Sequence, residues 1–131
     1  MRCAGRRRDQ WLRMLALGAL LLAIAACAAP PPLAVRQEME VGDRQQAWGV
    51  VYFASWSKDH NRHYLQLARE RTQEAVLLYL ALERRIGYSY PDFYVIDRRR
   101  VAGCDLLDQI NSEAESFQLH AFDRSRPGCF R

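Results

Sequence analysis

Three histidines and an aspartate are the residues whose types and spacing come closest to a metal site. Asp59, His60 and His63 stand close together, and His120 is the only other histidine. Residues 60 and 63 share one face of a helix, so two imidazoles there can meet a zinc ion. However, the sequence has no H-E-x-x-H pattern, and polar residues are common where a helix starts. A solvated helix turn is therefore favoured, and we expect no metal and no cofactor.

The residue sets used for nucleophilic catalysis are not found in this sequence. There is no G-x-S-x-G motif, and the seven glycines are scattered rather than gathered in a phosphate-binding loop. Glu70 and Glu74 lie one helical turn apart beside Arg69 and Arg71, which is typical of a salt-bridged surface. We therefore expect no catalytic residues and no enzymatic activity.

One run of positive charge, Arg98, Arg99 and Arg100, has a side-chain chemistry that suits an anionic partner. Guanidinium groups bind carboxylates and phosphates through charge and paired hydrogen bonds. Such a run is either solvated at the end of a strand or in a loop, or it is a docking point for an anionic partner.

Three aromatic residues form a second candidate contact. Trp48, Tyr52 and Trp56 recur every fourth residue, which places them on one side of a strand and also on one side of a helix. They either pack in the core or form an exposed patch of the kind that binds proteins.

The first residues of the chain carry the features of an export signal. Residues 1–13 contain five arginines and one acidic residue, and an apolar run follows over residues 14–26. This run is shorter than the roughly 20 apolar residues that cross a bilayer core. A short apolar run after a basic segment predicts a secretory signal rather than a permanent membrane span.

The end of this run, Ile24-Ala25-Ala26-Cys27, resembles the lipobox of bacterial lipoproteins. The resemblance is confined to the N-terminus, and it implies that residues 1–26 are a removed signal peptide and that Cys27 carries acyl chains. Several acyl chains anchor a protein stably in a lipid bilayer. An aspartate after the cysteine retains such lipoproteins at the inner membrane; Ala28 stands here instead. The resemblance therefore implies the periplasmic face of the outer membrane.

Removal of the signal changes the charge of the chain. The full sequence has a net charge of +4, but the residues after position 26 include 14 basic and 14 acidic ones. A neutral domain gives no reason to expect nucleic acid as a partner.

The sequence has four cysteines. Cys3 is removed with the signal peptide and Cys27 is acylated, so Cys104 and Cys129 are the two that remain free to pair. Disulfides persist outside the cytosol, so we expect these two to be joined, with two free buried thiols as the alternative. No C-x-x-C motif is present, which disfavours a redox pair.

The remaining pattern predicts a proline-rich tether over residues 27–46 and one small domain over residues 47–131. Residues 47–56 alternate apolar side chains on both faces, as a central strand does. A long helix is predicted over residues 57–86, with Ser57 or Asp59 as its N-cap and Gly87 as its stop.

Beyond the long helix the periodic pattern of apolar residues is weaker. It predicts strands over residues 92–98 and 117–122 and a short helix over residues 104–115 between them. The expected fold class is α+β, in the order β-α-β-(α)-β. A three-stranded sheet with the long helix packed on it, closed by the disulfide, buries these residues most simply.

The expected function is that of a membrane-anchored envelope lipoprotein that binds another envelope protein as an accessory or assembly factor. Its partners are the bilayer, through acylated Cys27, and a protein of the envelope. The alternative is a periplasmic ligand- or metal-binding domain that uses the region of His60 and His63.

Overall fold

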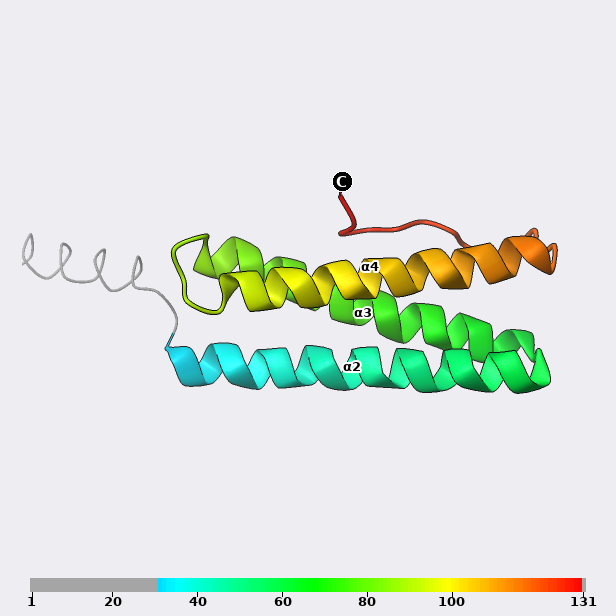
Figure 1. Ribbon diagram of the computed structural model, residues 1–131, viewed down its shortest axis with the longest axis horizontal. Helices are drawn as coiled ribbons and strands as arrows, with labels where there is room; N and C mark the ends of the chain where they lie inside the picture. The colour runs from blue at the N-terminus through cyan, green and yellow to red at the C-terminus, as the bar shows by residue number, and fades with distance from the viewer. Residues whose placement is uncertain (1–30, 131) are drawn as a thin grey trace, which may run out of the picture.

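A computed structural model describes residues 31–130 as three helices followed by an irregular tail (Figure 1). Helix α2 spans Pro32–Asp59, α3 spans Arg62–Ile86 and α4 spans Phe93–Ser116. Each helix runs back along the one before it, and no strand occurs in this part of the chain. The predicted α+β fold with a three-stranded sheet is therefore wrong, and residues 31–130 form an all-helical bundle.

Each helix buries a stripe of residues that recurs at alternating intervals of three and four. This heptad spacing keeps one side of a helix turned toward its neighbours and is typical of coiled-coil packing. The buried and half-buried members of the stripes are Val35, Met39, Gly42, Gln46, Gly49, Phe53 and Trp56 in α2; Leu65, Ala68, Thr72, Ala75, Tyr79, Leu82 and Ile86 in α3; and Phe93, Ile96, Arg100, Gly103, Leu107, Ile110 and Ala114 in α4.

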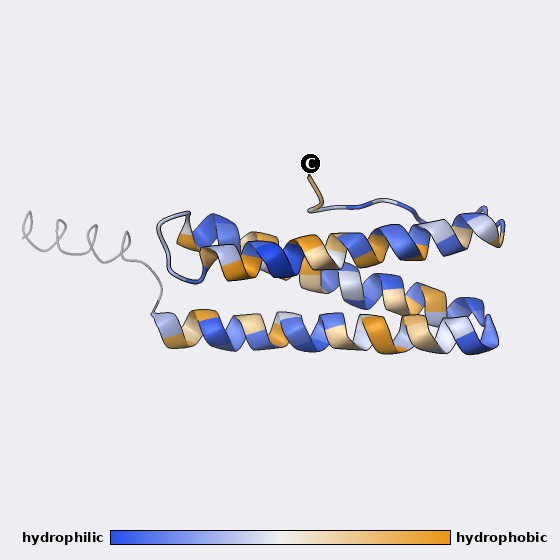
Figure 2. Ribbon diagram, in the orientation of Figure 1, coloured by the Kyte–Doolittle hydropathy of each residue, from blue (hydrophilic) through white to orange (hydrophobic). Residues whose placement is uncertain are grey.

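Helix α3 is the central element of the bundle. It packs along both α2 and α4, whereas α2 and α4 touch each other much less. It therefore buries a second row, Arg69, Val76 and Glu83, each seven residues after the last. Figure 2 shows hydrophobic residues recurring between hydrophilic ones along all three helices, as expected where only part of each helix faces the core.

Glycines let the backbones of α2 and α3 approach closely. A Cβ atom added at Gly42 would lie 2.6 Å from Cε1 of Tyr79, and one added at Gly49 would lie 2.2 Å from Oγ1 of Thr72. Gly49 also faces backbone atoms of α3 at 3.3 Å. Both glycines are buried within a helix and have no unusual φ angle. Glycine is needed at these positions because there is no space for a side chain.

In Gly49→Ala the added methyl overpacks the contact with Thr72, which costs about 1–3 kcal/mol. Alanine inside a helix gains about 1 kcal/mol over glycine, so we expect a net loss of up to about 2 kcal/mol. Urea unfolding followed by circular dichroism measures the difference. In the Thr72→Ala background the same change should cost clearly less, and equal costs in both backgrounds would contradict this account of the contact.

Residues at the ends of α2 and α3 explain where these two helices begin and stop. Pro32 occupies the start of α2, where its missing N–H costs nothing. His60 ends α2 in a left-handed conformation with φ of 49°, and the Asn61 side chain then caps α3 by accepting a hydrogen bond from the His63 N–H. Gly87 ends α3, as predicted from the sequence, but neither Ser57 nor Asp59 is the N-cap because both lie in α2.

The C-terminal tail folds back along α3 and α4 (Figure 1). Phe122 is buried against the core. Arg69 of α3 donates to Asp123 at 2.6 Å, and Arg126 pairs with Asp108 of α4 at 2.7 Å. The tail thus covers the α3–α4 side of the bundle with turns, and the strand predicted over residues 117–122 is not formed.

Three further sequence predictions are corrected by the helices. Residues 32–46, expected in the tether, form the first half of α2. Residues 47–56, expected as a central strand, form most of its second half. Residues 92–98, expected as a strand, contain the start of α4, of which the predicted short helix is only the later part. The signal peptide and Cys27 lie outside the described residues.

Candidate partner-binding surface

The three aromatic residues picked out in the sequence all lie on α2, but they differ in exposure. Trp48 is 49% exposed, Tyr52 is half-buried and Trp56 is only 2% exposed. The rings of Trp48 and Tyr52 stack with centroids 5.7 Å apart. Trp56 belongs to the core, where its Nε1 donates to Oε2 of Glu113 at 3.1 Å. Only the Trp48 end of this group is available to a partner.

A second stripe runs along the solvent side of α2. Its members, Val41, Arg44, Trp48 and Val51, are all exposed and follow one another at intervals of three, four and three residues. We call these four residues the outer stripe. Exposed apolar residues at heptad spacing are what a helix presents to another helix, and three of these four are apolar, so α2 carries one stripe for its own core and a second one facing outward. The stripe is not apparent in the sequence when residues 47–56 are assigned to a strand.

A surface hollow of about 310 Å³ lies beside the outer stripe, lined by Arg44, Gln45, Trp48, Tyr52 and Arg71. Arg71 donates to Gln45 at 3.3 Å and to Glu74 at 3.2 Å, whereas Arg44 has no ion-pair partner among residues 31–130. The hollow therefore combines an aromatic wall with one unpaired positive charge. It can accept a side chain that is partly apolar and partly acidic.

The three consecutive arginines point to different surroundings because they lie on α4 rather than at the end of a strand. Arg98 is exposed, and among residues 31–130 it donates only to the carbonyl of Tyr94, at 3.4 Å. Arg99 pairs with Asp43 of α2 at 2.8 Å. Arg100 donates to Glu83, to Asp97 and to the carbonyl of Gly128. Two of the three charges are thus used inside the protein.

Asp43 joins all three helices at one point. Its Oδ1 accepts from the Tyr79 hydroxyl of α3 at 2.6 Å, and its Oδ2 accepts from Arg99 of α4. Burial, and then the hydrogen bond to Asp43, raise the pKa of the Tyr79 hydroxyl well above its ordinary value. The phenol therefore stays protonated and holds α2 against α3 as a hydrogen-bond donor.

His60 and His63 contact aromatic rings rather than one another. His60 lies against Trp56 and Phe117, with its Nδ1 3.1 Å from the Trp56 carbonyl oxygen. His63 contacts the ring of Tyr64, and His120 lies in the tail. Within residues 31–130, no three His, Cys, Asp or Glu side chains are grouped so as to hold a metal ion.

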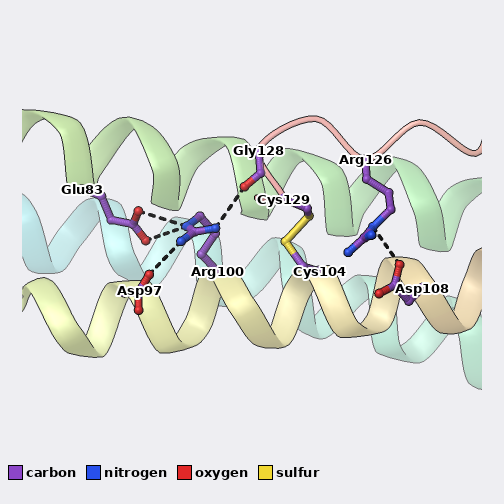
Figure 3. The surroundings of a disulfide bond; sticks show 8 residues. All are labelled: Glu83, Asp97, Arg100, Cys104, Asp108, Arg126, Gly128 and Cys129. Atoms are coloured by element: carbon purple, nitrogen blue, oxygen red, sulfur yellow. Dashed lines mark hydrogen bonds and ion pairs between the residues drawn. A yellow bond between two sulfur atoms is a disulfide. The ribbon is translucent and has the colours of Figure 1, made fainter. Parts of the chain in front are cut away.

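Cys104 and Cys129 are joined in a disulfide with their Cα atoms 5.7 Å apart, as predicted. Figure 3 shows the bond beside Arg100, which lies between Glu83, Asp97 and the carbonyl of Gly128. The covalent link and this arginine thus fix the same stretch of tail from two sides. Both stabilise the fold. The outer stripe is therefore the best candidate for a functional surface.

None of the helices in the described part of the chain is long and apolar enough to span a membrane. A comparison with known proteins finds no matching family model, no matching curated protein and no matching solved structure.

Proposed function

We propose that the protein is an exported lipoprotein of the cell envelope that binds a partner protein along the outer stripe of α2. The single observation that supports binding is the exposed heptad spacing of Val41, Arg44, Trp48 and Val51. The lipobox-like Ile24-Ala25-Ala26-Cys27 and the disulfide in the folded domain support an exported, acylated protein. Ala28 after the cysteine favours the outer membrane as the destination.

The chemistry of the outer stripe indicates what kind of partner fits it. An amphipathic helix can lay its apolar side chains against Val41, Trp48 and Val51. An acidic residue on that helix can pair with Arg44, the unpaired charge of the stripe. Arg98, the exposed member of the arginine run, lies on another helix and is not required for this contact.

Photo-crosslinking in the native envelope tests this proposal. A photo-reactive amino acid in place of Val51 should give one defined adduct with a partner protein. The same replacement at Val101, which is similarly exposed but lies on α4, should not give that adduct. Trp48→Ala should weaken the partner's affinity about thirtyfold or more, since a buried interface tryptophan contributes about 2 kcal/mol or more.

Mass spectrometry of the protein purified from its envelope tests the anchor. The mature chain should begin at an acylated Cys27. A crosslinking pattern that is the same at positions 51 and 101 would contradict the binding surface, and an unmodified Cys27 would contradict the anchor.

A further inference from the structure

One end of the bundle exposes apolar and aromatic side chains. This is the end where α2 begins and where residues 87–92 connect α3 to α4 (Figure 1). Leu33, Tyr88 and Tyr94 are all exposed there, with Tyr88 at 79%. We call these three residues the aromatic end. The rings of Tyr88 and Tyr94 both rest against the core residue Phe93, at centroid distances of 4.6 Å and 5.6 Å.

Unpaired arginines surround this end. Arg36, Arg84 and Arg98 are exposed and have no ion-pair partner among residues 31–130. The unpaired acidic residues near them are Glu40 and Asp92. The balance of free charge is therefore positive, beside aromatic rings that carry polar hydroxyl groups.

The chain before α2 is too short to hold this end far from an anchor at Cys27. Four residues separate Cys27 from Pro32, the first residue of α2. Even fully extended, this connection reaches at most about 18 Å. Helix α2, with 28 residues, is about 42 Å long. An acylated Cys27 therefore keeps the start of α2 near the bilayer, and the far end of the bundle can be much farther away.

We propose that the aromatic end contacts the surface of an anionic phospholipid bilayer and that the bundle stands on it end-on. This inference rests on the proposed acylation of Cys27. Tyrosine is enriched at the membrane interface, where its ring is apolar and its hydroxyl is hydrated. Arginine side chains pair with lipid phosphates. End-on contact leaves the outer stripe, on the side of α2, free for a partner protein.

Quenching by brominated lipids tests this orientation in the full acylated protein. The protein is placed in vesicles of phosphatidylethanolamine and phosphatidylglycerol whose acyl chains are brominated near the headgroup. In a Tyr88→Trp variant, the emission added by the new tryptophan should be largely lost. Tyr94→Trp serves as a second reporter at the same end. Both positions are exposed, so the replacements leave the core intact.

Controls come from the length of α2. The native Trp48 and Trp56 lie about 24 Å and 36 Å along the helix from Pro32, so their emission should not be quenched. Lys58→Trp adds an exposed tryptophan at the far end and should also escape quenching. Equal quenching of the Tyr88→Trp and Lys58→Trp variants, with Cys27 acylated, would overturn the orientation and leave the lipoprotein proposal standing. An unmodified Cys27 would overturn both.

Discussion

Loss of the disulfide should destabilise the protein by about 3–4 kcal/mol. The Cys104→Ser/Cys129→Ser variant opens a link between residues that are 25 positions apart, and the entropy of closing a loop of that size accounts for this value. A domain of this size has a total stability of roughly 5–15 kcal/mol, so the loss is a large fraction. We expect the melting temperature to fall by roughly 15–25 °C. Calorimetry of the purified variant measures the change.

The tail offers a matched control for the disulfide. Arg126→Gln removes the half-exposed ion pair with Asp108, which holds the same stretch of chain without a covalent bond. An ion pair that is largely open to solvent contributes about 1 kcal/mol or less. Treatment of the native protein with a reductant should reproduce the double-serine result. If the double-serine variant melts no lower than Arg126→Gln, noncovalent contacts alone hold the tail.

Much of the helical bundle can be read in the sequence once Arg100 is accepted as a core residue. In α4 the series runs through Phe93, Ile96, Arg100 and Gly103 without a break in its three-and-four spacing. A charged residue in the middle of the series divides it into an apolar segment and a weaker helix. The pattern therefore predicted a strand followed by a short helix, where the structure has one helix.

The second half of α2 was misread for a related reason. The segment over residues 47–56 carries apolar residues on its buried side and on the outer stripe, so it looks like a strand covered on both faces. A short apolar run does not distinguish the two structures by its periodicity. The decisive signal is longer, since Val35, Gly42, Gly49 and Trp56 recur every seventh residue across the whole helix. The prolines before α2 hid this series because they favoured an extended tether.

The candidate site was predicted only in part. Trp48 was identified from its residue type and spacing, and it is exposed on α2. Val41, Arg44 and Val51 were missed because their relation to Trp48 exists only on a helix. The pairing of Arg99 with Asp43 could not be foreseen, because 56 positions separate the two residues and only the packing of α4 near α2 joins them.

Replacement of Arg100 should have the second large effect on stability. The Arg100 side chain is 11% exposed and that of its partner Glu83 is 8% exposed. Burial alone would lower the pKa of Arg100, but hydrogen bonds and charge from Glu83 and Asp97 raise it above its ordinary value. Arg100→Gln would leave the Glu83 carboxylate buried without its cation. Removing one partner of a buried pair typically costs about 3–5 kcal/mol, and we expect a loss in that range.

The neighbouring arginine provides the control for this prediction. Arg98→Gln changes the same residue type on the same helix, but Arg98 is exposed and pairs with no acid in the described residues. The free energy of unfolding of this variant should therefore stay within about 0.5 kcal/mol of that of the native protein. Urea unfolding of both variants gives the comparison.

A double variant separates the missing charge from the missing packing. Glu83→Leu/Arg100→Met removes both charges and keeps comparable apolar volume, so it should recover much of the stability lost in Arg100→Gln. Similar stabilities for Arg98→Gln and Arg100→Gln would show that Arg100 is not held in the core. A large difference means that any test of the arginine run as a partner contact must change Arg98 alone, because replacing all three would also destabilise the bundle.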